Sequence, residues 1–570
     1  MNRKDQNRSL PISSLIVGVK TGLIGAILTV LLSLIGMVEA FSQREIIHEI
    51  ISMGHTLLLL AGCFIAYLSA KRTLLEKKSL ILGNSLMAGI LSSGSLILLV
   101  VLAHFVNLRS IFINASPVLL NLILLGQGIE KGSLLLILIG ALIGLFSGTL
   151  YLFPARIRKA MVLPLSSVLL AGVLQDLLRP TLSAWGPLSK LSDWLFTPNG
   201  LSLSGAITLA IFIGIGSHFW SSKGKGIQKG IKNLSLRQRR IITYSGFLIL
   251  IFILLILPHL LGLFLSEVLT IVGLYILLGL GLNIVVGYAG LLDLGYVAFF
   301  AIGAYTTAIL TSPELGFFHL SFWSALPIAI LMGIVSGVLL GIPVLKMRGD
   351  YLAIATLGFG EIIRILVLSD FLRPWLGGAQ GIGKIPKAMI GSFEFARPQE
   401  IYYLILAGCL LVVFISLRLK DSRIGRAWMA MREDEDVAQA MGINLVSTKL
   451  LAFATGAGFS ALSGAIFASK LGSVYPHSFN VMISINIVCL IIVGGMGSIP
   501  GVMVGAFALV GLPELLREFA EYRLLVYGAA LVAMMLLKPE GLWPEAIRRR
   551  ELHEESEGKT SNESPEETSV

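Results

Sequence analysis

Long apolar runs recur along the whole chain and are separated by short polar or basic stretches. Many of these runs contain about 20 residues, the length at which an α-helix spans the hydrocarbon core of a bilayer. The chain lacks the alternating pattern of transmembrane β-strands, and a helix satisfies its backbone polar groups within the segment. The pattern therefore predicts an all-α fold, a polytopic transmembrane helical bundle.

The apolar runs predict about 16 spans, the last ten of them after residue 240. The expected N-terminal spans are 15–37, 52–70, 79–105, 132–153, 160–176 and 203–220. The expected C-terminal spans are 241–263, 268–286, 289–311, 322–345, 351–368, 401–419, 450–471, 482–497, 500–516 and 524–538. The first run is longer than the apolar core of a signal peptide, which favours an uncleaved spanning helix.

Basic residues gather in loops that follow alternate expected spans, as they do in cytoplasmic loops. These loops contain Lys71 with Arg72, Arg156 to Lys159, Lys223 to Arg240, Lys346 with Arg348, the segment 418–432 and Arg548 to Arg550. This alternation predicts a multi-pass protein of the cell (inner or plasma) membrane with both termini in the cytoplasm.

The basic stretch 223–240 is the expected boundary between two membrane regions. It separates an N-terminal region, 1–222, from a second helical region, 241–545. A cytoplasmic linker is preferred for this stretch over a segment that binds anionic lipid. Residues 546–570 are rich in Glu, Ser, Thr and Pro and are expected to form a disordered cytoplasmic tail.

Composition agrees with a membrane protein and narrows its chemistry. Charged residues make up only 14% of the chain, against about 25% in soluble domains. The net charge is +11, but no aromatic and basic platform accompanies it, so nucleic-acid binding is not expected. The chain has no phosphate-binding loop, H-E-x-x-H or G-x-S-x-G motif. We therefore expect no ATPase site, no metal site and no enzymatic activity of its own.

The segment 279–310 is the first candidate for function. Its many glycines allow helices to approach closely or to break, and Asp293 lies at or near membrane depth. A carboxylate there is costly and usually functional, although a cap on a helix beginning near Gly295 is an equal alternative. The candidates for the translocation path in this segment are Asn283, Gly287, Asp293 and Tyr296.

The segment 343–364 is the second candidate. Glu361 and Arg364 are three residues apart and share one helical face, where they can pair inside the bundle. A purely structural ion pair is the preferred alternative to a role in the substrate path. The path candidates from this segment are Tyr351, Thr356, Glu361 and Arg364.

The charged loop after the expected span 401–419 is the third candidate. It predicts a short amphipathic helix over 426–441 that docks into a groove on another protein. The apolar side chains proposed for this contact are Trp428, Met429, Met431, Val437 and Met441. A helix lying on lipid is the alternative, and the acidic cluster 433–436 argues against it beside an anionic leaflet.

Five segments together resemble a known family, the M-type (LivM-like) permease subunits of branched-chain amino acid ABC importers. They follow the family's order over about 300 residues, and together they are highly specific. The segments are GLNIVVGYAGLLDLGYVAFFAIGAY (281–305), RGDYLAIATLGFGEIIR (348–364), GRAWMAMREDEDVAQAMGINLVSTKLLAF (425–453), IVGGMGSIPGVMVGA (492–506) and KPEGLW (538–543).

The resemblance implies an importer made of several subunits. A second permease subunit would pair with this chain, two ATP-binding subunits would drive it, and an extracytoplasmic binding protein would deliver Leu, Ile or Val. ATP would be bound by the partners, with no cofactor in this chain. The segment 425–443 corresponds to the family's coupling helix. Its candidate coupling residues are Arg426, Arg432, Glu433, Glu435, Asp436, Ala438, Ala440 and Gly442.

Two departures from the family pattern leave alternatives open. Residues 1–240 have no counterpart in the family core, and the loop 376–382 reads LGGAQGI, with Leu376 and Ala379 in place of Thr and Pro. The change in the loop 376–382 puts the branched-chain substrate in question, and urea or short amides are the alternative substrates. An ion-coupled secondary transporter using Asp293, Glu361 and Arg364 is the alternative from another class.

Overall fold

The computed structural model describes residues 10–73, 78–183, 186–232, 236–345, 347, 349–515, 517, 522–538 and 541–544. Most of the described residues are helical and very few are in strands, which confirms the predicted all-α fold class. They divide into two compact units between Ile249 and Leu250. The predicted boundary at 223–240 lies just before this division, and helices α10 and α11 occupy most of that stretch.

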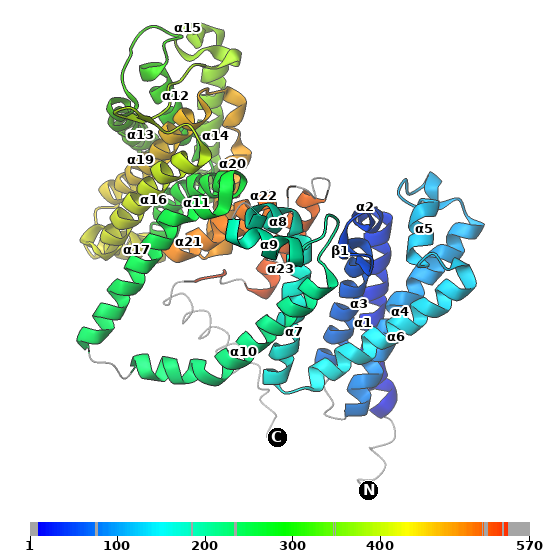
Figure 1. Ribbon diagram of the computed structural model, residues 1–570. Helices are drawn as coiled ribbons and strands as arrows, with labels where there is room; N and C mark the ends of the chain where they lie inside the picture. Colours follow the sequence, from blue (N-terminus) through cyan, green and yellow to red (C-terminus); the bar gives the residue numbers. More distant parts are fainter. Residues whose placement is uncertain are drawn as a thin grey trace, which may run out of the picture. The chain divides into compact units, whose positions relative to one another are not determined.

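Four long helices form the main bundle of unit 1 (Figure 1). They are α1 (Leu10–Leu34), α3 (Met53–Arg72), α4 (Lys78–Phe105) and α6 (Gly128–Leu152). Small residues allow the closest crossings, because a Cβ at Gly89 of α4 would overlap the carbonyl oxygen of Gly140 in α6. Membrane helices that pack through such small residues gain van der Waals contact along their backbones.

Further elements complete unit 1. They are α2 (Met37–Ser42), β1 (Glu45–Ile47), β2 (Ile51–Ser52), η1 (Leu108–Ser110), α5 (Pro117–Ile123), α7 (Ala155–Val173), α8 (Gln175–Ser183), α9 (Gly186–Leu195) and α10 (Leu203–Lys232). Helices α7 and α8 meet at a bend of 79°. The predicted span 160–176 is therefore one arm of a broken apolar segment.

Unit 2 is built around α19 (Leu445–Leu471), the most buried of its long helices. Small residues such as Ala457 and Ala461 let α12 and α13 lie directly against α19. The elements before α19 are α11 (Leu236–Leu282), η2 (Asn283–Tyr288), α12 (Val297–Thr311), α13 (Phe322–Val344), α14 (Asp350–Leu368), η3 (Asp370–Leu372), α15 (Arg373–Leu376), η4 (Gly378–Gln380), β3 (Met389–Ile390), β4 (Phe393–Glu394), α16 (Pro398–Asp421), α17 (Arg423–Glu433) and α18 (Glu435–Ala440). Those after it are η5 (Pro476–Ser478), α20 (Val481–Gly494), α21 (Ile499–Ala506), η6 (Phe507–Gly511), α22 (Leu512–Leu515) and α23 (Arg523–Leu537).

Ten helices among the described residues are long and apolar enough to cross a membrane, or 11 if the bent pair in unit 1 is one span. The expected number of about 16 is not confirmed by this measure. Two expected spans, 241–263 and 268–286, fall largely on the apolar stretch Leu248–Tyr288, which is kinked between them at Gly262, with a φ of +75° and a ψ of −171°. Other expected spans fall on shorter apolar helices, which are Leu203–Ser217, Val297–Thr311 and Ile499–Leu515.

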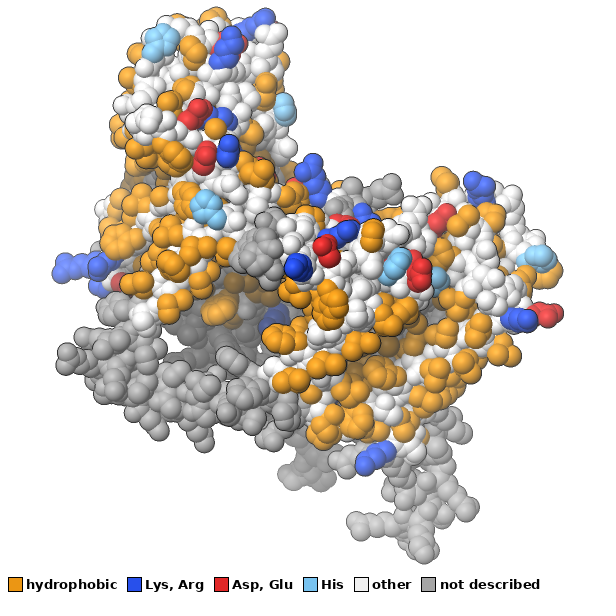
Figure 2. All heavy atoms as spheres, viewed as in Figure 1, with side chains coloured by type: hydrophobic (Ala, Val, Ile, Leu, Met, Phe, Trp, Pro, Cys, Tyr) orange, Lys and Arg blue, Asp and Glu red, His pale blue; other side chains and the backbone are white. Residues whose placement is uncertain are grey.

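Large apolar side chains cover much of the helix surface in each unit (Figure 2). On α6, for example, Leu134, Leu138 and Leu142 are all exposed and recur every four residues along one face. A stripe of this kind is costly in water and suits contact with lipid chains. The surface chemistry thus agrees with the helix lengths in indicating a multi-pass membrane protein.

Candidate functional site

The chain breaks its helix at the end of α11, within the first candidate segment. Residues Asn283–Tyr288 form the π-helical turn η2, and a non-helical stretch follows before α12 begins at Val297. The Asn283 Oδ1 accepts a hydrogen bond of 2.9 Å from the backbone N–H of Gly497. A Cβ at Gly287 would overlap that same Asn283 oxygen, so the turn needs glycine there. π-helical turns of this kind are frequent at functional sites.

Asp293 lies in the non-helical stretch and is fully buried. Its Oδ1 accepts a hydrogen bond of 2.9 Å from the backbone N–H of Gly295, while its Oδ2 has no hydrogen-bond partner among the described residues. The first contact closes a local turn before α12, whose N-cap is Tyr296 and has no side-chain cap bond, so Asp293 is not the N-cap of that helix. The Oδ2 atom is a buried acceptor that is not used, which is costly and typical of a polar cavity or a functional group.

Tyr296 and Thr356 fix the same stretch to the bundle. The Tyr296 hydroxyl donates a hydrogen bond of 2.8 Å to the carbonyl oxygen of Gly456 in α19. The Thr356 Oγ1 in α14 accepts the backbone N–H of Leu294 at 3.0 Å. Both side chains are buried, and these bonds give them positioning roles in the structure.

The predicted amphipathic helix over 426–441 is two helices, α17 and α18, with a break at Asp434. The backbone of Asp434 is extended, and its Oδ1 accepts the N–H groups of Asp436 and Val437. Aspartate is a favoured N-cap because its carboxylate satisfies these otherwise unpaired donors. The acidic cluster therefore ends one helix and begins the next.

Helix α17 is anchored to the membrane helices of its own chain. Trp428 is fully buried, and its Nε1–H donates a hydrogen bond of 2.8 Å to the carbonyl oxygen of Thr448 in α19. Arg432 Nη1 donates a bond of 2.7 Å to the carbonyl oxygen of Gly287 in η2. Helix α17 thereby contacts both the central helix α19 and the broken span.

Helix α18 is tied to α19 by an ion pair. Glu435 Oε1 lies 2.8 Å from Lys449 Nζ, and these side chains are only 19% and 4% exposed. Lys449 is not among the predicted site residues, although a lone lysine in the apolar run LVSTKLLAF is a signal for a buried partner.

The predicted docking residues divide into buried and exposed groups. Trp428 and Met431 are buried within this chain, so they do not belong to a docking surface, and their earlier assignment is wrong. Val437 and Met441 are 59% and 80% exposed. Among the coupling candidates, Ala438 is buried, while the exposed ones are Arg426, Glu433, Asp436, Ala440 and Gly442.

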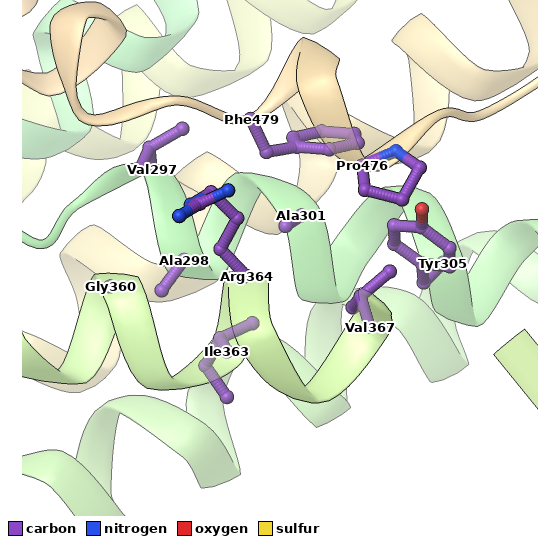
Figure 3. A pocket seen from close by; sticks show the side chains of 10 residues that line it. All are labelled: Val297, Ala298, Ala301, Tyr305, Gly360, Ile363, Arg364, Val367, Pro476 and Phe479. Carbon is purple, nitrogen blue, oxygen red and sulfur yellow. The ribbon is translucent and has the colours of Figure 1, made fainter. Parts of the chain in front are cut away.

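Glu361 and Arg364 pair as the spacing predicts, with the Arg364 Nε donating to Glu361 Oε2 at 2.8 Å. Arg364 also lines a small pocket between α12, α14 and the residues around η5 (Figure 3). The other lining residues are Val297, Ala298, Ala301, Tyr305, Gly360, Ile363, Val367, Pro476 and Phe479. Tyr305 and Phe479 carry no sequence signal of their own, because many aromatic residues occupy these helices.

The remaining path candidate lies apart from this pocket. Tyr351 lies in the first turn of α14, a helix whose other half carries Arg364, and it is 78% exposed. The structure thus groups the candidates into three sets. In the first, Asn283 and Gly287 lie in η2, where Gly287 accepts the Arg432 bond; in the second, Asp293 and Tyr296 flank Leu294, which bonds to Thr356; the third pairs Glu361 with Arg364.

Comparisons with known proteins agree on one family. Residues 264–535 match the family model described as the branched-chain amino acid transport system permease component. The chain is 43% identical over 301 residues to the high-affinity branched-chain amino acid transport permease LivM of Escherichia coli (strain K12), covering 49% of this chain and 69% of the relative.

Two more distant relatives have similar names. A probable LivM of Methanocaldococcus jannaschii is 24% identical over 327 residues, covering 49% of this chain and 93% of the relative. The permease LivH of E. coli (strain K12) is 32% identical over 136 residues, covering 23% of this chain and 44% of the relative. No solved structure matches the chain significantly.

Proposed function

This chain belongs to the branched-chain amino acid transport permease family, and we propose that it is the LivM-like subunit of an ATP-driven importer for leucine, isoleucine and valine. The family match lies in unit 2, which holds α17, α18 and the broken span. The observation that carries the proposal is the bond from Arg432 to the carbonyl oxygen of Gly287. This bond joins α17, which together with α18 carries exposed side chains, to η2, where a spanning helix is interrupted.

The partners in this proposal are a second, LivH-like permease subunit, two ATP-binding subunits and an extracytoplasmic amino-acid-binding protein. The chain itself takes no cofactor, and ATP is bound and hydrolysed by the partners. Exposed Val437 and Met441, flanked by Glu433 and Asp436, offer an apolar contact with an acidic rim for an ATP-binding subunit. The end of unit 2 that carries α17 then faces the cytoplasm.

The mechanism transmits movement of α17 and α18 to the spanning helices. Closure of the ATP-binding subunits displaces the helix pair as a rigid body, since buried Trp428 and the Glu435–Lys449 pair hold it to α19. The Arg432 bond carries that displacement to η2. A π-helical turn next to a non-helical stretch yields more readily than a continuous helix, so the span moves at this point.

The test is reconstitution of the complete complex in proteoliposomes. ATP hydrolysis and uptake of radiolabelled leucine are measured with and without loaded binding protein. We expect both to rise only when the binding protein is loaded. The proposal would be contradicted if the rate of ATP hydrolysis were the same with and without loaded binding protein. It would also be contradicted if the chain never co-purified with an ATP-binding subunit. Uptake of urea or acetamide in place of leucine would select the other substrate class.

Ion-coupled secondary transport is the second candidate, because buried Asp293 has one oxygen without a partner among the described residues. In that case the purified chain would accumulate solute in liposomes under an ion gradient without ATP. We expect no such uptake from the chain alone.

A further inference from the structure

The pocket of Figure 3 combines one charged group with apolar walls. Arg364 is held by Glu361 through its Nε, and its two terminal nitrogens donate no hydrogen bond to any described residue. The side chain is about one-third exposed, at 35%. A guanidinium presents its terminal N–H groups in a fork that matches a carboxylate. Its orientation by Glu361 leaves that fork available to an anion.

The walls of the pocket are aliphatic and aromatic. Ala301 of α12, Ile363 and Val367 of α14 and the ring of Phe479 surround the space beside Arg364. Figure 3 shows the guanidinium at one end, near Val297, and Tyr305 at the other end, near Pro476. Such a surface gains free energy by covering an alkyl group, and it offers an alkyl group no competing polar partner.

The pocket lies toward the end of unit 2 opposite α17. Helix α14 runs from Asp350 at the α17 end, where Leu345 accepts a hydrogen bond from Lys449, to Leu368 at the other end. Arg364 belongs to its last two turns, and η5 follows the far end of α19. If α17 is cytoplasmic, the pocket lies in the outer half of the membrane, on the side from which a binding protein delivers solute.

We propose that this pocket is the subsite in which the permease receives an aliphatic α-amino acid, with the substrate carboxylate on the Arg364 guanidinium and the alkyl side chain against Ala301, Ile363 and Phe479. This inference rests on the proposed function and deepens it. The free space now holds about one water molecule, at about 10 Å³, so the pocket is closed to substrate in this conformation. Phe479, which directly follows the short turn η5, closes it and packs against the rings of Phe300, Tyr305 and Phe467.

The first test compares arginine variants in the complete reconstituted complex at saturating loaded binding protein. Leucine uptake and stimulated ATP hydrolysis are measured side by side. Arg364→Gln should lower leucine transported per ATP by about tenfold or more, because it removes a charge-assisted contact. Arg364→Lys should lose less, since it keeps the charge. Arg373→Gln, which alters an exposed arginine in α15, should match the wild type.

The variant Glu361→Gln distinguishes two roles of Arg364, as an anion subsite or as half of a structural ion pair. Its amide oxygen still accepts the Arg364 Nε–H, so the guanidinium stays in place. Under the proposal this variant keeps most of the transport that Arg364→Gln loses. Equal loss of assembly and transport in both variants would show a structural pair and overturn the subsite.

The second test alters the apolar wall of the pocket, and its result is read together with that of Arg364→Gln. Ala301→Val narrows the pocket at a buried position and should lower leucine uptake relative to valine uptake by a few-fold. An unchanged leucine-to-valine ratio together with wild-type transport by Arg364→Gln would overturn the subsite and leave the importer intact. Absence of leucine and valine transport by the wild-type complex would instead overturn the proposed function.

Discussion

At the scale of single residues, the tightest constraint in the broken span is at Gly295. A Cβ there would overlap the carbonyl oxygen of Thr356 in α14. The same Thr356 accepts the backbone N–H of Leu294 through its hydroxyl. The non-helical stretch before α12 and helix α14 are therefore held in contact at two successive residues, Leu294 and Gly295. A side chain at position 295 must therefore separate α14 from the segment that holds Asp293.

The first prediction is that Gly295→Ala destabilises the protein by about 1–3 kcal/mol, as overpacking does in other cores. The measurement is thermal unfolding of the purified protein in detergent. Gly358→Ala in α14 is the matched control, because a Cβ there meets no atom within 4 Å. The control should leave the melting temperature unchanged or raise it, since alanine favours a helix. Equal melting temperatures for both variants would contradict the close contact.

Arg432 is the residue whose bond crosses from α17 to the broken span. We predict that Arg432→Gln preserves assembly with the partner subunits and lowers binding-protein-stimulated ATP hydrolysis by about tenfold, because the bond from a charged donor is lost. Arg432→Lys retains a charged donor and should keep part of the stimulation. Full stimulation in Arg432→Gln would exclude this bond as the transmission path.

Asn283, Gly287 and Arg432 are all predicted candidates, but nothing in the sequence indicates that they lie together. Arg432 and Gly287 are separated by 145 positions. The acceptor is a backbone carbonyl, which every residue type has, so the residue at that position does not reveal the hydrogen bond. Glu361 and Arg364 were paired correctly because helical spacing alone brings them together. Local contacts were thus predictable, whereas contacts between distant segments were not.

At the scale of elements, the Glu435–Lys449 ion pair attaches α18 to α19. Because Lys449 is 4% exposed, removing the Glu435 carboxylate takes the counter-ion from a buried charge and leaves it a long contact of 3.5 Å to the carbonyl oxygen of Leu345. We predict that Glu435→Gln lowers the free energy of unfolding by about 3–5 kcal/mol. The double variant Glu435→Gln/Lys449→Met should recover much of that loss, which a double-mutant thermal cycle measures. Additive losses in the cycle would argue against a direct pair.

Gly442 ends α18 with a φ of +86°, and a Cβ there would meet no neighbouring atom. Substitution is therefore strained by about 1–2 kcal/mol but not sterically blocked. We predict that Gly442→Arg assembles with its partners and loses stimulation of ATP hydrolysis, whereas Gly442→Ala is affected much less. Co-purification and ATPase assays distinguish the two variants. Unchanged transport by Gly442→Arg would count against a coupling role for α18.

The elements also show where apolar periodicity succeeds and where it fails. Long runs such as Lys78–Phe105 and Pro398–Asp421 were predicted as spans and are helices of that length. The expected span 289–311 fails because its first residues turn through Gly290, which has a φ of +72°, and Asp293 before α12 begins. A break of this kind keeps the apolar composition of a span, so hydropathy alone does not detect it.

At the scale of the whole molecule, each unit has hydrophobic clusters of its own. One cluster, from Val268 to Ala506, contains residues of unit 2 alone. Two others, from Val38 to Leu136 and from Val168 to Ala206, contain residues of unit 1 alone. The family match at 264–535 also falls within unit 2, so the matched region and this cluster of described residues belong to the same unit.

We therefore predict that a chain beginning at residue 223 folds, assembles with the partner subunits and retains stimulated ATP hydrolysis. The physical reason is that the buried surface around α19 is complete within unit 2. Size-exclusion chromatography and the ATPase assay test the shortened chain against the full one. Aggregation of the shortened chain would mean that unit 1 covers surface that unit 2 exposes alone. A soluble assembly with no stimulation would instead place unit 1 in the coupling between binding protein and ATP hydrolysis.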